Sequence, residues 1–214
     1  MRGFRTKGAR DAYYKAMLGR YLPGDRVSAS DEAELRDLLA LHPKAGEKIG
    51  VGVACFDVRR SGKGSNCFWI IREDGSETDF SYLKCLKGEP PIKAKVSAAF
   101  RDAVAQDVYA VRAALFAERD RVPCALTGQL LSVDEGHMDH QPPMTFDAIV
   151  AFFLAQESMT HSDVAIIDGG DGRTAVELAN PELAQRFRDY HNSVAKLAFV
   201  EIHAHLALPK GRPA

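Results

Sequence analysis

The chain has 214 residues and a formal net charge of −1, with 46% hydrophobic and 27% charged residues. This balance is typical of a soluble globular protein, and it argues against a uniformly basic nucleic-acid coat or an acidic disordered tail. The near-zero net charge hides an asymmetry between the two halves of the chain. Residues 1–95 carry 18 Lys and Arg against 13 Asp and Glu, whereas residues 96–214 carry 10 Lys and Arg against 16 Asp and Glu. This asymmetry suggests two units with different partners, although a split of this size also arises by chance.

The four cysteines lie far apart, and none forms a Cys-x-x-Cys pair. Their spacing predicts neither a zinc knuckle nor a disulfide framework, and it favours a reduced, cytoplasmic setting. The N-terminal residues lack an apolar signal core, and the longest apolar stretch, residues 148–155, is far shorter than the ~20 residues of a membrane span. We therefore predict a cytoplasmic protein with no membrane partner.

The first half predicts a small α+β unit, in which two helices pack on a three-stranded meander. Ser30 is the candidate N-cap of the second helix, and Pro43 ends it. Asp74-Gly75 is a strong hairpin signal between two β-rich stretches. The predicted elements are helices over 9–21 and 31–42 and strands over 49–58, 67–72 and 78–83.

The second half begins after the Pro- and Gly-containing stretch 87–91, which is the natural domain boundary. Thr145 is the candidate N-cap of a strongly apolar helix that runs to Gln156. The predicted elements are a long connecting helix over 93–119, a hairpin over 125–133, a polar segment over 136–143, a helix over 146–156, strands over 164–168 and 174–178, and a final helix over 180–205. We therefore expect a domain over 1–91, a connecting helix over 92–121 and a second domain over 122–214.

Six of the seven histidines lie in the second half, and the densest polar group there contains His137, Asp139 and His140. A carboxylate beside an imidazole suits metal-assisted hydrolysis, because the carboxylate holds a cation while the imidazole takes a proton from water. The competing interpretation is that exposed histidines of a polar loop simply cluster.

The second half also resembles an HNH endonuclease, in which two strands and a helix surround one metal ion (a ββα-metal domain). The resemblance rests on Asp139-His140 followed by Pro142-Pro143, on Cys124, and on the stretch LAFVEIHAHL, whose His205 takes the terminal His position. It implies a general base, a site for one divalent cation, Mg²⁺ or Mn²⁺, and phosphodiester hydrolysis in DNA.

The residue roles follow from that resemblance. His140 would be the general base, Asp139 and His205 would hold the cation, and His191 is a weaker further ligand. The middle Asn of the family pattern has no clear counterpart, since Lys196 stands there by simple spacing, and His191 or Asn192 could substitute for it. Glu201 and Ala204 stand where the family commonly has cysteines, so no structural zinc is expected.

Residues 7–86 resemble the DCL domain, and the resemblance is carried by HPKAGEKIGVG and REDGSETDFSYLKCL. It implies a module associated with nucleic acid. Basic side chains in this half could hold backbone phosphates, and Trp69 could stack on a base. The competing interpretations are a solvated surface for the charges and a protein core for most of the aromatic residues. The candidate nucleic-acid-binding residues are Lys44, Lys48, Arg59, Arg60, Lys63, Trp69, Arg72, Lys84 and Lys87.

These observations together predict a metal-dependent HNH-type endonuclease that cuts DNA, with the DCL-like half binding nucleic acid. A single site per chain would favour a homodimer for cutting both strands. The alternative is a non-catalytic DNA- or RNA-binding protein, active in RNA processing, with a degenerate HNH-like half.

Overall fold

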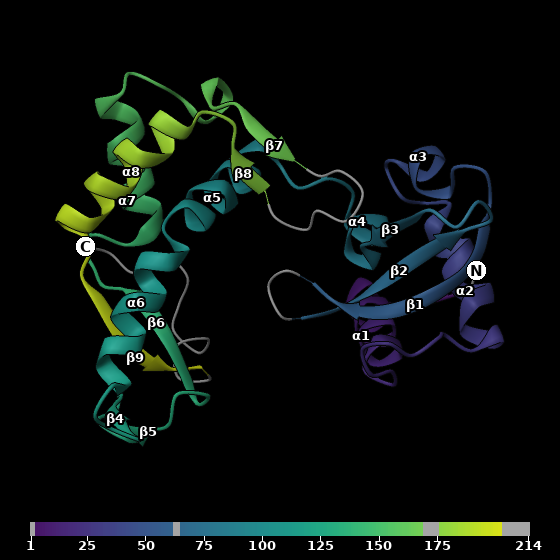
Figure 1. The fold of residues 1–214 in the computed structure, drawn as a ribbon, viewed down its shortest axis with the longest axis horizontal. Coiled ribbons are helices and arrows are strands. Elements are labelled where there is room, and N and C mark those ends of the chain that lie inside the picture. The colour runs from purple at the N-terminus through teal and green to yellow at the C-terminus, as the bar shows by residue number, and fades with distance from the viewer. Residues whose placement is uncertain (1–2, 62–64, 169–175, 203–214) are drawn as a thin grey trace. The chain divides into compact units, whose positions relative to one another are not determined.

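A computed structural model describes residues 3–61, 65–168 and 176–202. The chain folds as two compact units, unit 1 formed mainly by residues 1–91 and unit 2 mainly by residues 92–214 (Figure 1). Both combine helices with small antiparallel sheets, which confirms the predicted α+β class. None of the helices in the described ranges is long and apolar enough to cross a membrane.

Unit 1 is built on a three-stranded antiparallel sheet in the order β1-β2-β3. Alternate residues of its strands, such as Phe56, Phe68 and Phe80, turn one face of the sheet into the core, because neighbours along a strand point to opposite faces. Tyr14 of the first helix and Leu38 of the second belong to the same core. The elements are α1 (Lys7–Leu18), α2 (Ala29–Leu39), α3 (Ala45–Ile49), β1 (Val53–Arg60), β2 (Asn66–Arg72), β3 (Glu77–Phe80) and α4 (Tyr82–Lys87).

Three sequence predictions for unit 1 need correction. The N-cap of α2 is Ser28, whose hydroxyl accepts a hydrogen bond from the Asp31 backbone, and not Ser30. The strand predicted to begin at residue 49 begins at Val53, because residues 45–49 form α3. The strand predicted to end at residue 83 ends at Phe80, after which the Ser81 side chain caps α4.

Unit 2 contains a helical part and three two-stranded pairings. Phe100, Phe153 and Phe187 come from three different helices and form a buried aromatic cluster, with ring centroids 4.4–5.8 Å apart. The elements are α5 (Ile92–Ala103), α6 (Ala105–Phe116), β4 (Val122–Pro123), β5 (Leu130–Leu131), β6 (Gly136–His140), α7 (Phe146–Gln156), η1 (His161–Asp163), β7 (Ile166–Asp168), β8 (Val176–Leu178), α8 (Pro181–Val194) and β9 (Leu197–Glu201).

The long connecting helix is wrong as a single element. It breaks into α5 and α6 at Val104, whose φ of −105° and ψ of 1° lie outside the helical region while its side chain is buried. Both helices belong to unit 2.

The closing helix and the polar segment also differ from prediction. Helix α8 ends at Val194, and residues 197–201 form β9 instead of continuing the helix. Residues 136–140 form β6 rather than a loop, and β6 pairs antiparallel with β9, with His140 opposite Leu197. Between β6 and β9 the chain forms α7, η1, β7, β8 and α8, so the two paired strands lie far apart in sequence.

Candidate nucleic-acid interface and candidate catalytic histidines

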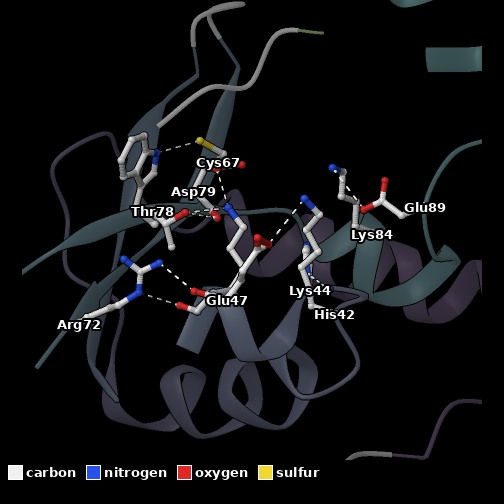
Figure 2. A network of polar contacts seen from close by, with 11 residues as sticks. His42, Lys44, Glu47, Cys67, Arg72, Thr78, Asp79, Lys84 and Glu89 are labelled. Carbon is white, nitrogen blue, oxygen red and sulfur yellow. Dashed lines mark hydrogen bonds and ion pairs between the residues drawn. The ribbon is translucent and has the colours of Figure 1, made fainter. Parts of the chain in front are cut away.

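In unit 1 a polar network ties α3 to the sheet (Figure 2). Arg72 of β2 donates hydrogen bonds to the backbone carbonyls of Glu47 and Lys48, both at 3.1 Å. These carbonyls lie in the last turn of a helix, where unpaired acceptors favour a cation. Gly50 makes this approach practicable, because its φ is +56° and a Cβ atom there would lie 2.9 Å from Arg72 Cδ.

Two of the candidate nucleic-acid-binding residues are therefore structural. Arg72 is 7% exposed, and its guanidinium is occupied by the carbonyls of α3. The Lys48 side chain is 13% exposed, and its ammonium contacts Thr78 Oγ1 at 2.7 Å and Asp79 Oδ1 at 2.9 Å. Neither cation is presented to a phosphate, which corrects the sequence interpretation. The physical reason is burial, which a pattern of charges in sequence does not reveal.

Replacing Arg72 by leucine should lower the free energy of unfolding of unit 1 by about 2–3 kcal/mol, because two carbonyls lose their donor. Trp69 is the single tryptophan of the chain and lies in unit 1, so its fluorescence during urea unfolding measures this unit. Arg60→Leu is the matched control, since Arg60 is exposed and surface changes cost about 0.5 kcal/mol or less. Equal effects of the two changes would contradict the structural role of Arg72.

The remaining basic candidates lie nearer the surface. Lys44 and Lys87 are 51% and 60% exposed at the side chain and pair with Glu47 and Asp11. Lys84 pairs with Glu89 at 3.6 Å, and Arg60 is exposed. Exposed ion pairs contribute about 0–1 kcal/mol, so a phosphate can compete for these lysines. Lys63 lies outside the described residues.

Trp69 and Arg59 form a stacked pair on the sheet face opposite the core. The Arg59 Cζ atom lies 4.8 Å from the Trp69 ring centroid, and the guanidinium also bonds to Asp57 and Glu77. The hydrogen bonds that the guanidinium donates to Glu77 and Asp57 raise the pKa of Arg59 above its usual value. The indole Nε1 donates to Cys67 Sγ at 3.2 Å. One face of the indole is thus covered by Arg59, which limits its use as a stacking platform.

In unit 2 the structure brings His140 and His191 together. His140 is the last residue of β6, and His191 lies in the last turn of α8. Their Nε2 atoms are 2.9 Å apart, which is a hydrogen bond between two imidazoles. His191 is 1% exposed, and the ring centroid of Phe146 lies 5.1 Å from that of half-buried His140. The aromatic rings of Phe146 and Phe187 thus flank a pair of hydrogen-bonded imidazoles.

The pKa of His140 is lowered to about 4, mainly by burial; the neighbouring His191 and Arg101 contribute to the lowering, and Asp139 opposes it. His140 is therefore neutral at physiological pH, with a nitrogen lone pair available. A neutral imidazole can accept a proton from water or donate an electron pair to a metal ion.

The lowered pKa has a consequence for stability. Below pH 6.5 the unfolded chain protonates this histidine, whereas the folded chain does so only near pH 4, so lower pH favours unfolding. We expect unit 2 to lose about 1 kcal/mol from this group between pH 7 and pH 5, after allowance for solvent screening of a half-buried group. Urea unfolding followed by far-UV circular dichroism measures the loss. A His140→Gln variant should show a correspondingly smaller dependence on pH, and an identical dependence would refute this assignment.

Asp139 lies beside His140 in β6 but on the other face of the strand, because neighbouring side chains alternate. Its carboxylate accepts a hydrogen bond from the Gln141 amide at 3.3 Å. Among the residues that the structure describes, no three His, Cys, Asp or Glu side chains gather where a metal ion could bind. His205 lies outside the described residues. The described donors therefore do not make a complete cation site.

Two residues at the histidine pair were not singled out from the sequence. Arg101 of α5 lies over the Phe146 ring, with Cζ 4.3 Å from the centroid, and contacts Asp147 loosely at 3.6 Å. Its side chain is 56% exposed, so it adds an accessible positive charge near His140. Asp107 of α6 bonds to Arg188 of α8. No motif spacing points to either residue, since both precede the histidine cluster in sequence.

Cys124, the one cysteine that matches the HNH pattern, is buried near β9. Its Sγ atom accepts hydrogen bonds from the backbone N–H groups of Leu126 at 3.4 Å and Glu201 at 3.3 Å. Burial raises the pKa of the Cys124 thiol, but these bonds and those from Thr127 outweigh it, so the pKa is lowered overall. All four cysteines lie in the described ranges, and none of them forms a disulfide.

Comparison with known proteins bears on unit 1. Residues 15–86 match the family model described as "Protein of unknown function (DUF3223)". This part of the chain is a DUF3223 domain. The match extends from within α1 to the end of α4, so it contains the whole network around Arg72. The match ends before His140 and His191, which belong to a part of the chain that this family does not cover.

The DUF3223 domain is homologous to DCL proteins. Protein DCL, chloroplastic, of Solanum lycopersicum is 42% identical over 73 residues, which are 33% of this chain and 33% of that protein. DNA-directed RNA polymerase IV subunit 1 of Arabidopsis thaliana is 40% identical over 79 residues, which are 36% of this chain and 5% of that protein. The chain thus spans a third or less of these curated relatives.

One solved structure is also similar to part of this chain. The solution NMR structure of an uncharacterized protein from Rhodospirillum rubrum has 51% sequence identity and a TM-score of 0.38, and the similarity covers 39% of this chain and 81% of that one.

Proposed function

We propose that this chain hydrolyses phosphodiester bonds in nucleic acid, with the DUF3223 domain as the binding module and unit 2 as the cutting module. The observation that carries the proposal is the 2.9 Å contact between His140 and His191, which two distant segments of unit 2 build in an apolar setting. A half-buried imidazole that contacts a second imidazole and has a lowered pKa is a candidate functional group, because perturbed titratable groups cluster at functional sites.

His140 is the proposed general base. It is neutral at physiological pH, because burial lowers its pKa to about 4, and it can therefore take a proton from an attacking water molecule. Arg101 supplies positive charge nearby, which suits a phosphate group that becomes more negative during attack. His191 positions the base through its hydrogen bond and is too deeply buried to replace it.

Binding is proposed for the exposed basic residues of the DUF3223 domain, Lys44, Arg60 and Lys87. The names of relatives support a nucleic-acid role, because one is a subunit of a DNA-directed RNA polymerase. The preference for DNA, the need for Mg²⁺ or Mn²⁺, the cytoplasmic setting and a homodimer remain predictions from sequence.

One experiment tests the proposed activity. The full chain is incubated with plasmid DNA and with structured RNA, in Mg²⁺, in Mn²⁺ and with a chelator. Cleavage of either polymer supports the proposal, and its loss with chelator supports the cation. Intact DNA and RNA under all conditions would overturn the enzyme proposal.

A second candidate function is nucleic-acid binding without catalysis. It is favoured by one observation, since the described residues do not bring three metal-ligating side chains together. Retention of DNA or RNA in a gel-shift assay without cleavage in any metal would select this function.

The proposed interface predicts which lysines matter. Reversing Lys44 and Lys87 together to glutamate should weaken binding about tenfold, and it should reduce the dependence of log Kd on log salt by about two, because two phosphate contacts are lost. Fluorescence anisotropy with labelled DNA measures both. Lys7→Glu with Lys15→Glu gives the same change in charge at two exposed lysines of α1 that are not among the proposed binding residues. An equal loss in this control would mean that only net charge matters.

A further inference from the structure

The histidine pair is the end of a longer chain of hydrogen bonds that starts on α6. Asp107 Oδ1 accepts from Arg188 Nη2 at 2.9 Å, and Oδ2 accepts from Arg188 Nε at 3.1 Å. The same Oδ2 accepts from Asn192 Nδ2 at 3.4 Å. Asn192 Oδ1 lies 3.0 Å from His191 Nδ1, and His191 Nε2 lies 2.9 Å from His140 Nε2. Helices α6 and α8 and strand β6 thus contribute to one continuous path of hydrogen bonds within unit 2.

The direction of each hydrogen bond follows from the chemistry of its partners. An ionised carboxylate only accepts, so the Asn192 side chain must turn its NH₂ group towards Asp107 and its carbonyl oxygen towards His191. A carbonyl oxygen also only accepts, so His191 Nδ1 must carry a proton. Neutral His191 then has a lone pair on Nε2, and the short contact with His140 requires a proton on His140 Nε2.

We propose that Asp107 and Asn192 are positioning residues that fix the tautomers of both histidines, so that His140 keeps its lone pair on Nδ1. The inference rests on the proposed function only in assigning His140 Nδ1 as the nitrogen that accepts a proton from water. The tautomers themselves follow from the hydrogen bonds of the folded protein, whether or not it cleaves nucleic acid. A bond that orients and fixes the tautomer of a histidine is a familiar support for general bases.

Breaking the hydrogen-bond path at Asn192 should exchange the tautomers of His191 and His140. In Asn192→Leu the His191 Nδ1 proton loses its acceptor, so His191 can move that proton to Nε2 and donate to His140. His140 would then be protonated on Nδ1, and the nitrogen proposed as the base would be blocked. Asn192 lies within the helix but is exposed, so the substitution keeps the buried side of α8 unchanged.

The test is a two-bond ¹H–¹⁵N NMR spectrum of the full chain, because the ¹⁵N shifts of an imidazole distinguish the two tautomers. In the unmodified protein we expect the Nδ1–H form for His191 and the Nε2–H form for His140. In Asn192→Leu we expect both assignments to exchange, and any cleavage to fall by at least tenfold. Gln185→Leu, which removes another amide of α8 that bonds to an aspartate, should leave the spectrum unchanged.

The outcomes separate the inference from the proposed function. Finding the Nε2–H form for His191 in the unmodified protein overturns the inference, even if the Asn192 variant fails to fold. Unchanged tautomers in a folded Asn192→Leu variant also overturn it. The expected tautomers in a protein that cuts neither DNA nor RNA would support the hydrogen-bond path and reject the nuclease.

Discussion

Replacing His140 by alanine is expected to slow phosphodiester cleavage by about 10²–10⁴-fold, which is the usual contribution of a positioned general base. The loss should be this large because His191, the nearest imidazole, is buried and hydrogen-bonded on both ring nitrogens. Binding of nucleic acid should change by less than about twofold, since the binding residues are proposed for the DUF3223 domain. Cleavage rates under single-turnover conditions and gel-shift titrations measure the two effects separately.

The control for this prediction is His161→Ala. His161 is a histidine of unit 2 that lies in η1 and takes no part in the pair. Its replacement should leave cleavage and binding unchanged. The role of His140 is rejected if the two variants lose activity equally, or if binding disappears together with cleavage.

Replacing Phe187 by alanine should lower the free energy of unfolding of unit 2 by about 3–5 kcal/mol. Phe187 is fully buried, and its ring centroid lies 4.4 Å from that of Phe100 and 5.1 Å from that of Phe153. Removing the ring leaves a cavity between three helices. It also removes support from His191, one helical turn further along α8, so cleavage should fall as well.

The measurement uses the position of the single tryptophan. Trp69 reports on unit 1, whereas far-UV circular dichroism reports on both units. In Phe187→Ala we expect the dichroism transition to shift to lower urea while the fluorescence transition stays in place. Phe187→Leu, which keeps most of the apolar volume, should be milder, at about 1–2 kcal/mol. A joint shift of both transitions would show that the effect is not confined to unit 2.

The sequence predicted those elements best whose local signals agree with their packing. Helix α7 begins and ends as expected, because Thr145 caps it and an apolar run follows. The hairpin at Asp74-Gly75 also forms, with Gly75 at a φ of +80°. The break at Val104 carries no Pro or Gly signal and accompanies burial of its side chain. The sequence predicts a helix over the stretch LAFVE, yet pairing with β6 makes it a strand.

The candidate site was predicted in part. A dense polar motif indicates His140, and the sequence indicates His191 more weakly, but their contact depends on how α8 lies against β6. Arg72 is a candidate that the sequence misplaces, because a basic residue in a strand is expected at the surface, whereas Arg72 is buried. Asp107 has no sequence signal, because its importance comes entirely from bonds to α8.

The pairing of β6 with β9 also determines when the histidine site can exist during synthesis. The sheet of unit 1 joins strands that follow one another directly, so it can form as soon as residue 80 is available. Strand β6 must wait until residues 197–201 have been made, and His140 must wait for α8. Since chains fold from the N-terminus onward as they are made, the proposed binding module should be folded before the proposed cutting module is assembled.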